Sequence, residues 1–263
     1  MTGCTEPVAA LTDARLAFGD RVLWDHLDLT VAPGEFVVVL GPNGTGKTAL
    51  LKVLLGGLSL SRGAVTVCGR QPGTGNPRVG YVPQHHPIDR DVVLRGRDLV
   101  QLGLDGRHWG IARRSRGARA RRRAAVDQAL RDANAEALAD VAVGRMSGGE
   151  LQRVRIAQAL VSDPALLLCD EPLLTLDPAN TELISALIDR RRREAGTAVI
   201  LVTHEINPVL PYADRVLYLA DGRFRTGTVD DVMTTETLSE LYGADIRVLR
   251  IDDRYVVMDG TTL

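Results

Sequence analysis

The feature that most constrains this 263-residue chain is a glycine-rich segment, GPNGTGKT, at residues 41–48. It follows an apolar run at 35–40 and precedes an apolar helical stretch at 49–55. A strand, a tight glycine turn and a helix in this order predict a phosphate-binding loop, or P-loop. A glycine-rich strand-to-helix turn without a ligand is the alternative, but it does not explain the lysine and threonine that end the segment.

Each residue type in the loop has an electrostatic reason to be there. Glycines let successive backbone N–H groups turn inward around a phosphate, Lys47 brings positive charge toward the β and γ phosphates, and the Thr48 hydroxyl can bind Mg²⁺. The loop therefore predicts a site for a nucleotide and Mg²⁺. Its candidate binding residues are Gly41, Pro42, Asn43, Gly44, Thr45, Gly46, Lys47 and Thr48.

Short β-rich runs recur along the chain, at residues 78–82, 165–169, 197–202 and 215–220 in addition to 35–40. Continuous apolar character within such runs predicts strands buried on both faces, as in a parallel sheet that helices cover. Between residues 89 and 160, Ala, Arg and Leu dominate, which predicts a helical insert without strands. The expected fold class is therefore α/β.

Two adjacent carboxylates, Asp170 and Glu171, follow the apolar run at 165–169. Like charges at the end of a buried strand repel and are partly desolvated, so they need a metal or a shared proton to compensate. Asp170 suits the Mg²⁺ shell, and Glu171 suits polarisation of an attacking water. Alone the pair would be only a polar turn, but beside a P-loop it predicts catalysis.

A second motif, Met146-Ser147-Gly148-Gly149-Glu150, precedes another helical stretch. Ser147 and Glu150 form a capping-box pattern, and a capped helix start presents N–H groups to an anion. Together with the P-loop, the motif resembles the signature of ATP-binding cassette (ABC) ATPases, which meets the γ-phosphate of ATP bound by a second subunit. The resemblance makes Ser147, Gly148, Gly149 and Glu150 candidate nucleotide contacts.

The resemblance extends along nearly the whole chain and implies roles for residues that carry little signal alone. Phe18 is similar in position to the aromatic side chain that stacks on adenine. Gln84 resembles the Q-loop glutamine, which makes it a candidate for both catalysis and metal binding. His204 follows the run at 197–202 and resembles the switch histidine that contacts the γ-phosphate.

Asp177 resembles the D-loop aspartate at the dimer interface, and before Pro178 it is also a good helix N-cap. The signature departs from the usual family pattern in having Met146 for Leu and Glu150 for Gln. Methionine conserves volume and apolarity. Glu150 brings a negative charge near the expected phosphate unless its carboxylate turns back to the cap.

The resemblance implies a P-loop NTPase of the ABC ATPase type, with a RecA-like mixed-sheet core, an antiparallel β subdomain and an α-helical insert. The expected ABC ATPase domain spans 8–234, with a helical subdomain at about 89–160, and 235–263 form a short C-terminal appendage. One P-loop and one signature per chain imply a two-fold dimer with a second copy, clamping two ATP molecules. ATP hydrolysis is the expected activity, with ATP and Mg²⁺ bound.

A transmembrane helix needs about 20 apolar residues, whereas the run at 36–40 ends at Gly41 and Pro42. We therefore expect a peripheral protein at the cytoplasmic face of the cell membrane, bound to a separate polytopic permease and, through it, to an extracytoplasmic substrate-binding protein. Segments 90–97 and 238–249 resemble the manganese and zinc importer branch. His85 and His86 are then polar loop residues at the permease rather than metal ligands.

With 32 Lys and Arg against 33 Asp and Glu, the net charge is −1, which gives no reason to expect a wholesale polyanion binder. Segment 107–123 is rich in arginine, but 4% aromatic content leaves few rings for base stacking, so a solvated face near anionic lipid is preferred over nucleic acid. Two other function classes stay open: a soluble assembly ATPase, for example for iron–sulfur scaffolds, and nucleic-acid remodelling. Cys4, Cys68 and Cys169 lie far apart, which predicts a reducing compartment without disulfides.

Overall fold

The computed structural model describes residues 6–73, 75–84, 89, 92–105 and 116–259. Several sequence-based predictions concern residues outside these ranges. They are those for Cys4, His85, His86, Arg107, Arg113 and Arg114, and the first part of segment 90–97.

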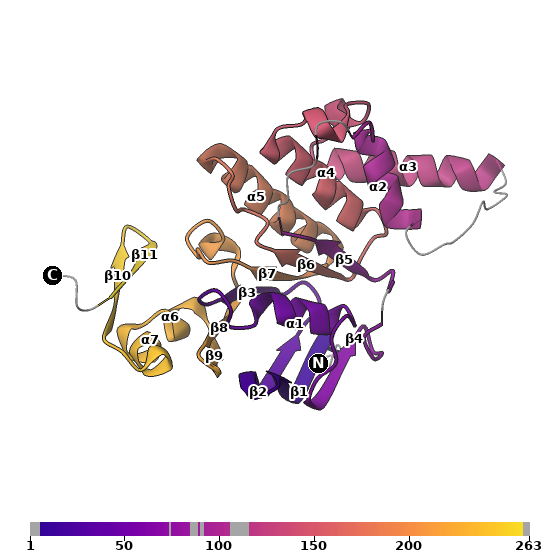
Figure 1. The fold of residues 1–263 in the computed structure, drawn as a ribbon. Coiled ribbons are helices and arrows are strands. Elements are labelled where there is room, and N and C mark those ends of the chain that lie inside the picture. The colour runs from indigo at the N-terminus through magenta and orange to yellow at the C-terminus, as the bar shows by residue number, and fades with distance from the viewer. Residues whose placement is uncertain (1–5, 74, 85–88, 90–91, 106–115, 260–263) are drawn as a thin grey trace, which may run out of the picture.

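A six-stranded sheet, ordered β5-β6-β7-β3-β8-β9, forms the centre of the molecule (Figure 1). All of its strands are parallel except β9, an antiparallel edge strand that was not predicted. The five predicted strands are confirmed, with ends shifted by at most one residue. Their bounds are β3 Phe36–Leu40, β5 Val79–Val82, β6 Leu166–Asp170, β7 Ala198–Val202 and β8 Arg215–Ala220, and β9 is Arg223–Gly227.

The sheet is buried on both faces, as its continuous apolar runs predict. In β3, Val37 and Val39 point into a core shared with α1 (Lys47–Leu54), while Val38 points into a second core shared with α4 (Gly148–Leu160) and α5 (Pro178–Ala195). Alternate residues of one strand thus join two separate cores. This two-sided burial holds the strand ends, and the loops that follow them, in place.

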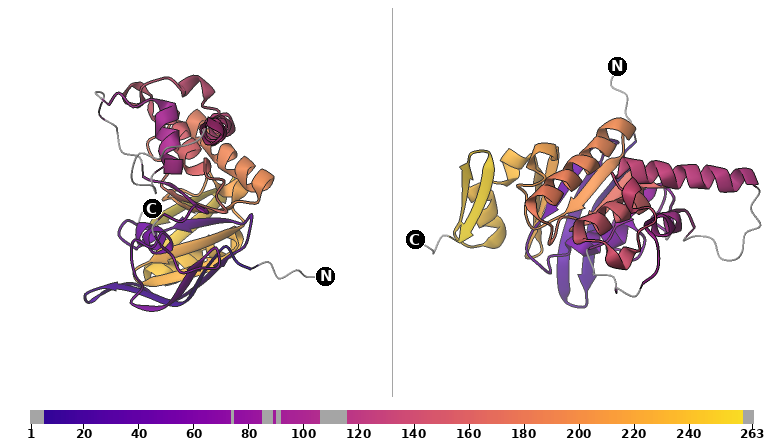
Figure 2. Two further views of the ribbon diagram at one scale, coloured as in Figure 1. Left: turned by 90° about the vertical axis from the view of Figure 1, so that its right-hand side faces the viewer. Right: turned by 90° about the horizontal axis from the view of Figure 1, so that it is seen from above.

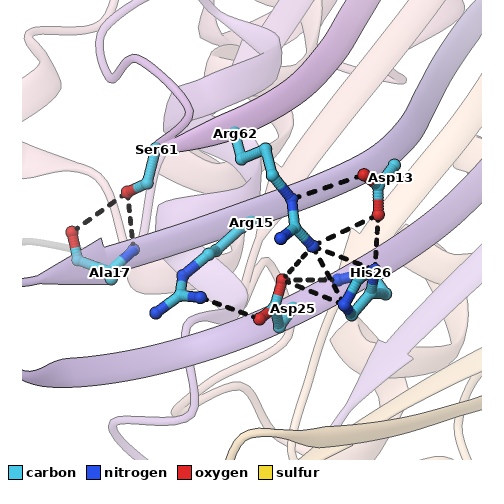
Figure 3. Close-up of polar contacts among 7 residues, drawn as sticks. All are labelled: Asp13, Arg15, Ala17, Asp25, His26, Ser61 and Arg62. Carbon is cyan, nitrogen blue, oxygen red and sulfur yellow. Dashed lines mark hydrogen bonds and ion pairs between the residues drawn. The ribbon is translucent and has the colours of Figure 1, made fainter.

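The expected antiparallel β subdomain is a three-stranded sheet of β2, β1 and β4, which are Arg21–Val31, Ala9–Phe18 and Arg62–Val67. Figure 3 shows a charged cluster on its exposed side, where the Arg62 guanidinium lies between Asp13 (Nε to Oδ2 3.3 Å) and Asp25 (NH2 to Oδ1 2.8 Å). The hydrogen bond from His26 is the main cause that lowers the pKa of Asp13. Side-chain pairing across strands therefore supports a sheet whose register shifts along β1.

Helices occupy the described part of residues 89–160, as predicted. They are α2 (Gly96–Asp105), α3 (Arg116–Asp132) and α4, with 3₁₀ turns at Glu136–Leu138 and Val143–Arg145. Two views show this layer on the opposite side of the central sheet from β1, β2 and β4 (Figures 1 and 2). No helix in the described ranges is long and apolar enough to cross a membrane.

The C-terminal segment adds two helices and a hairpin. The elements are α6 (Val229–Val232), α7 (Thr235–Tyr242), β10 (Ile246–Ile251) and β11 (Arg254–Asp259), and a 3₁₀ turn at Leu210–Tyr212 precedes β8. Leu238 and Leu241 of α7 are buried in the same core as α4 and α5. The hairpin lies at the edge of the molecule, at the left of Figure 1. The division into a domain at 8–234 and an appendage at 235–263 stays a prediction.

Helix α5 begins at the predicted N-cap, Asp177, and ends at Gly196, which is a left-handed C-cap. Its terminal arginines do more than balance the helix dipole. Arg192 donates from Nε to Asp189 (2.9 Å) and from NH1 to Asp214 (2.5 Å), and Asp214 accepts the Phe36 N–H (2.8 Å) at the start of β3. This network ties the end of α5 to the central strand.

We expect Asp189→Asn to lower the free energy of unfolding by about 1.5 kcal/mol, because Asp189 is 2% exposed and accepts bonds from two guanidinium groups. Asp163→Asn is the matched control, since Asp163 also pairs with an arginine of α5 but is 86% exposed. Its expected cost is below about 0.5 kcal/mol. Urea unfolding of both variants tests the difference, and equal costs would contradict a structural role for the buried pair.

Candidate nucleotide site

The carboxyl ends of four neighbouring parallel strands meet at one edge of the central sheet. The P-loop follows β3, Gln84 follows β5, Glu171 follows β6 and His204 follows β7. A pocket of about 1100 Å³ opens at this edge. Open α/β sheets bind ligands outside the carboxyl ends of their strands, and the location fits that rule.

Most of the residues predicted from sequence line this pocket: Phe18, Gly41, Pro42, Asn43, Gly44, Gly46, Lys47, Thr48, Gln84, Glu171 and His204. Thr45 does not, because its hydroxyl donates to the Pro42 carbonyl oxygen (2.9 Å) and the residue is buried in the loop. Asp170 also lies outside the lining, directly behind Thr48. Residues far apart in sequence are therefore brought to one cavity, as the motif order predicts.

The P-loop turns tightly against the sheet. Gly41 has a φ of 137°, and a Cβ at this residue would lie 2.0 Å from the carbonyl oxygen of Leu219 in β8, so only glycine fits. The Lys47 ammonium donates to the carbonyl oxygens of Gly41 (2.6 Å) and Pro42 (2.8 Å). Burial lowers the pKa of Lys47, while the negative charges of Glu171 and Asp170 act in the opposite direction.

The oxygen atoms around Asp170 suit a hard divalent cation. Asp170 Oδ1 accepts a hydrogen bond from the Thr48 hydroxyl (3.0 Å), and Oδ2 lies 3.5 Å from the Tyr81 hydroxyl. Burial is the main cause that raises the pKa of Asp170, and burial together with Asp170 raises the pKa of Tyr81 to about 12. A hydroxyl and a carboxylate at hydrogen-bond distance fit the oxygen preference of Mg²⁺. Sequence reasoning missed Tyr81.

Glu171 is held between two polar side chains at the rim of the pocket. Its N–H donates to the Val202 carbonyl of β7 (2.9 Å), and its backbone has a φ of 47°. Glu171 Oε2 lies 3.4 Å from Gln84 Nε2 and 3.9 Å from His204 Nδ1. The strained backbone and these neighbours direct the carboxylate toward the space above the P-loop.

The signature motif forms the capping box that its sequence predicts. Ser147 caps α4, its N–H donates to Glu150 Oε2 (2.8 Å), and the Glu150 N–H donates to Ser147 Oγ (3.4 Å). The backbone hydrogen bond from Ser147 is the main cause that lowers the pKa of Glu150. The unusual carboxylate therefore turns back to the helix start, which is the arrangement that removes its conflict with a phosphate.

The structure does not bring the signature to the pocket. None of Ser147, Gly148, Gly149 and Glu150 is among the described residues that line it. The signature packs instead on the start of α5, where a Cβ on Gly149 would lie 2.4 Å from Asn180 Oδ1. Asn180 in turn donates its N–H to Asp177 Oδ1 (2.9 Å). The signature and Asp177 thus form a second surface, separate from the P-loop within one chain.

Six further residues of the described ranges line the pocket without having been predicted: Arg21, Leu23, Ala49, Lys52, Leu58 and Leu174. Arg21 NH2 donates to the Gly44 carbonyl (2.8 Å), and Arg21 pairs with Phe18 across the β1–β2 turn. The Gly19-Asp20 turn could have indicated Arg21 as a pocket residue, because a tight turn between two strands places Phe18 and Arg21 at the same end of the hairpin. Lys52 lies one helical turn after Thr48 on the same face.

A strand, P-loop and helix, with a carboxylate pair at the end of the next strand but one in the same sheet, define a P-loop nucleoside triphosphatase. Comparison with known proteins shows to which family of these enzymes the chain belongs. The pattern that describes ABC transporter domains matches residues 24–174. The chain belongs to the ABC transporter family, and it is an ATP-hydrolysing subunit of a transporter.

Relatives with assigned transport roles differ in substrate. The chain is 36% identical over 231 residues to the zinc import ATP-binding protein ZnuC of Alkalilimnicola ehrlichii, covering 87% of this chain and 80% of that protein. It is 39% identical over 261 residues to the aliphatic sulfonates import ATP-binding protein SsuB 1 of Nocardia farcinica, covering 97% and 94%. These relatives support an ATPase of a transporter and leave its cargo open.

Among solved structures, an inward-facing ABC transporter of the metal-chelate type has a subunit with the same fold. Its TM-score is 0.82 at 24% identity, and the alignment covers 98% of this chain and 100% of that one. The similarity includes the C-terminal segment, and it supports the fold class predicted from sequence: an ABC ATPase core with a mixed sheet and a helical insert.

We expect Lys47→Ala to weaken ATP binding about a hundredfold, because it removes the cation that the loop carbonyls hold inside the pocket. Lys52→Ala is the matched control on the same helix. Lys52 lines the pocket but is exposed, so the expected loss is about threefold. Titration with a fluorescent ATP analogue measures both, and equal losses would contradict the role assigned to Lys47.

Proposed function

We propose that this ATPase drives a separate polytopic permease that imports a metal ion of the manganese or zinc type. The proposal places the chain at the cytoplasmic face of the membrane, with an extracytoplasmic substrate-binding protein delivering the ion to the permease. The observation that carries the ATPase part is the position of Glu171, held beside Gln84 and His204 above the P-loop. The zinc-import relative supports the choice of cargo.

The separation of the signature from the pocket supports a dimer. One chain carries a P-loop with Glu171 on one surface and Ser147 to Gly149 on another. A two-fold dimer of identical chains brings each signature to the partner's P-loop and completes two sites at once. ATP then lies between the copies, and loss of the γ-phosphate removes contacts that hold them together. Bond cleavage is thereby converted into movement of the subunits.

Within each site, residues of the chain bind the nucleotide, orient the attacking water and accept its proton. Lys47 and the P-loop N–H groups hold the phosphates, and Phe18 stacks on the adenine. Thr48, Asp170 and Gln84 would hold Mg²⁺, which would neutralise part of the phosphate charge. Glu171 orients the attacking water and accepts its proton. Gln84 and His204 keep the Glu171 carboxylate directed at that water, and His204 also contacts the γ-phosphate.

We expect Glu171→Gln to retain ATP binding, to trap a stable ATP-bound dimer and to reduce turnover at least about a hundredfold, since an amide cannot accept the proton from water. Glu205→Gln is the control, because Glu205 follows His204 at the next cavity and is exposed. Its turnover should stay within about twofold of the unsubstituted protein. Phosphate release and size-exclusion chromatography with ATP measure the two properties. Normal turnover in Glu171→Gln would overthrow Glu171 as the base.

The cargo is tested by reconstituting the chain with the polytopic protein encoded by neighbouring reading frames. We expect ATP-dependent uptake of Zn²⁺ or Mn²⁺ by proteoliposomes and none of an aliphatic sulfonate, with uptake lost in Glu171→Gln. Uptake of the sulfonate alone would contradict the metal assignment. Purification from native membranes with soluble assembly factors and no polytopic protein would favour the assembly ATPase, and stimulation of hydrolysis by RNA or DNA would favour nucleic-acid remodelling.

A further inference from the structure

The C-terminal hairpin of β10 and β11 is bonded to the loop that carries His204 through the side chain of Asn207. Asn207 Nδ2 donates to the carbonyl oxygen of Tyr255 in β11 (2.9 Å), and Asn207 Oδ1 accepts the Tyr255 N–H (2.8 Å). A side-chain amide offers donors and an acceptor side by side, as a peptide group does, so Asn207 pairs with β11 as a residue of a neighbouring strand would. Two segments that are 48 residues apart in the sequence are therefore held together at this point.

Asn207 precedes Pro208, and an Asn-Pro pair ordinarily favours the start of a turn. The turn is present, since the Val209 N–H donates to the Ile206 carbonyl oxygen (2.9 Å). An asparagine that only shapes a turn bonds its own backbone two residues further on. Here both ends of the amide are directed to Tyr255, so the side chain joins distant segments in addition to favouring the turn.

Tyr255 is a firm anchor for this contact. The residue is buried, and its hydroxyl donates to Asp230 Oδ1 of α6 (2.6 Å). Arg250, which is opposite Tyr255 in β10, lies over the ring at 5.7 Å from its centroid and also pairs with Asp230 (3.2 Å). Because the ring, the hydroxyl and both backbone groups of Tyr255 are engaged, this residue can fix the position of the loop that Asn207 belongs to.

His204 depends on the backbone on either side for its position, because its imidazole Nδ1 lies 3.9 Å from Glu171 Oε2, beyond hydrogen-bond distance. Before His204, the Thr203 N–H donates to a carbonyl oxygen of β3 (3.1 Å). After it, Ile206 is buried in the core, and Asn207 is bonded to the hairpin. Apolar burial has no direction, so on this side the two hydrogen bonds of Asn207 set how the loop is oriented.

We propose that Asn207 is a positioning residue for ATP hydrolysis, which holds the His204 imidazole beside Glu171 by tying the loop to Tyr255. The inference rests on the role proposed above for His204 at the γ-phosphate. Asn207 is not among the described residues that line the nucleotide pocket, so it acts through His204 and not by contact with ATP. Docking of the hairpin on Asn207 therefore affects the rate of hydrolysis rather than the affinity for ATP.

The test uses two variants of Asn207 and a matched control in the same hairpin. Asn207→Ala removes both hydrogen bonds, whereas Asn207→Asp keeps a turn-forming residue before Pro208 but cannot donate to the Tyr255 carbonyl oxygen. Ser239→Ala is the control. Ser239 Oγ of α7 accepts the Ile246 N–H (3.1 Å) and donates to the Ile246 carbonyl oxygen (3.0 Å), which is the same pair of bonds made to the other strand.

Phosphate release by the full chain with ATP and Mg²⁺ gives kcat and KM for each variant, and urea unfolding verifies that it is folded. We expect both Asn207 variants to lower kcat about tenfold and to leave KM for ATP within about twofold, because a misplaced group slows the chemical step without weakening binding. Ser239→Ala should keep kcat within about twofold, since it loosens the hairpin without releasing the His204 loop. Equal losses of kcat in Asn207→Ala and Ser239→Ala would overturn the proposal, as would normal turnover in Asn207→Asp.

A double variant tests whether Asn207 acts through His204. His204→Ala alone should be slow, and adding Asn207→Ala should slow it by less than about twofold more, because the group that Asn207 positions is already absent. A further loss of about tenfold in the double variant would overturn the proposal. Normal turnover in the Asn207 variants beside a slow His204→Ala would overturn this inference alone. Normal turnover in His204→Ala would refute the role proposed for His204, and this inference with it.

Discussion

The arrangement of the site depends on one close approach of backbone, between the P-loop and strand β8. A Cβ on Gly41 would lie 2.0 Å from the Leu219 carbonyl oxygen, so any other residue would force the loop away from the sheet. Because β3 lies between β7 and β8, the loop emerges at the middle of the carboxyl edge. Glu171 and His204 reach the same pocket only because their strands end beside that point.

This close packing places a cation and two carboxylates in one partly dehydrated region. Lys47 is held by loop carbonyl oxygens, and burial lowers its pKa although the negative charges of Glu171 and Asp170 act in the opposite direction. Neither carboxylate forms an ion pair with an arginine or lysine in the described part of the chain. The region therefore contains an ammonium group and two carboxylates that form no ion pair with one another. This is expected of a site where a triphosphate and a divalent cation would supply the missing partners.

Local sequence signals predicted the central strands and both helix caps, since continuous apolar runs, Ser147 with Glu150, and Asp177 before Pro178 act over a few residues. The strands of the antiparallel sheet were not located, because register shifts in β1 interrupt its alternation.

In the signature motif, the negative charge of Glu150 does not conflict with binding of a phosphate at the start of α4. Glu150 uses its carboxylate on the Ser147 N–H and hydroxyl, and these bonds lower its pKa so that it stays ionised and keeps the cap. A charged acceptor holds a helix start more strongly than the usual amide would. The N–H groups of Gly148 and Gly149 donate to no acceptor in the described part of the protein. Because the carboxylate is committed to the cap, those two donors stay available at the positive end of α4, the place where a partner's γ-phosphate would complete the site.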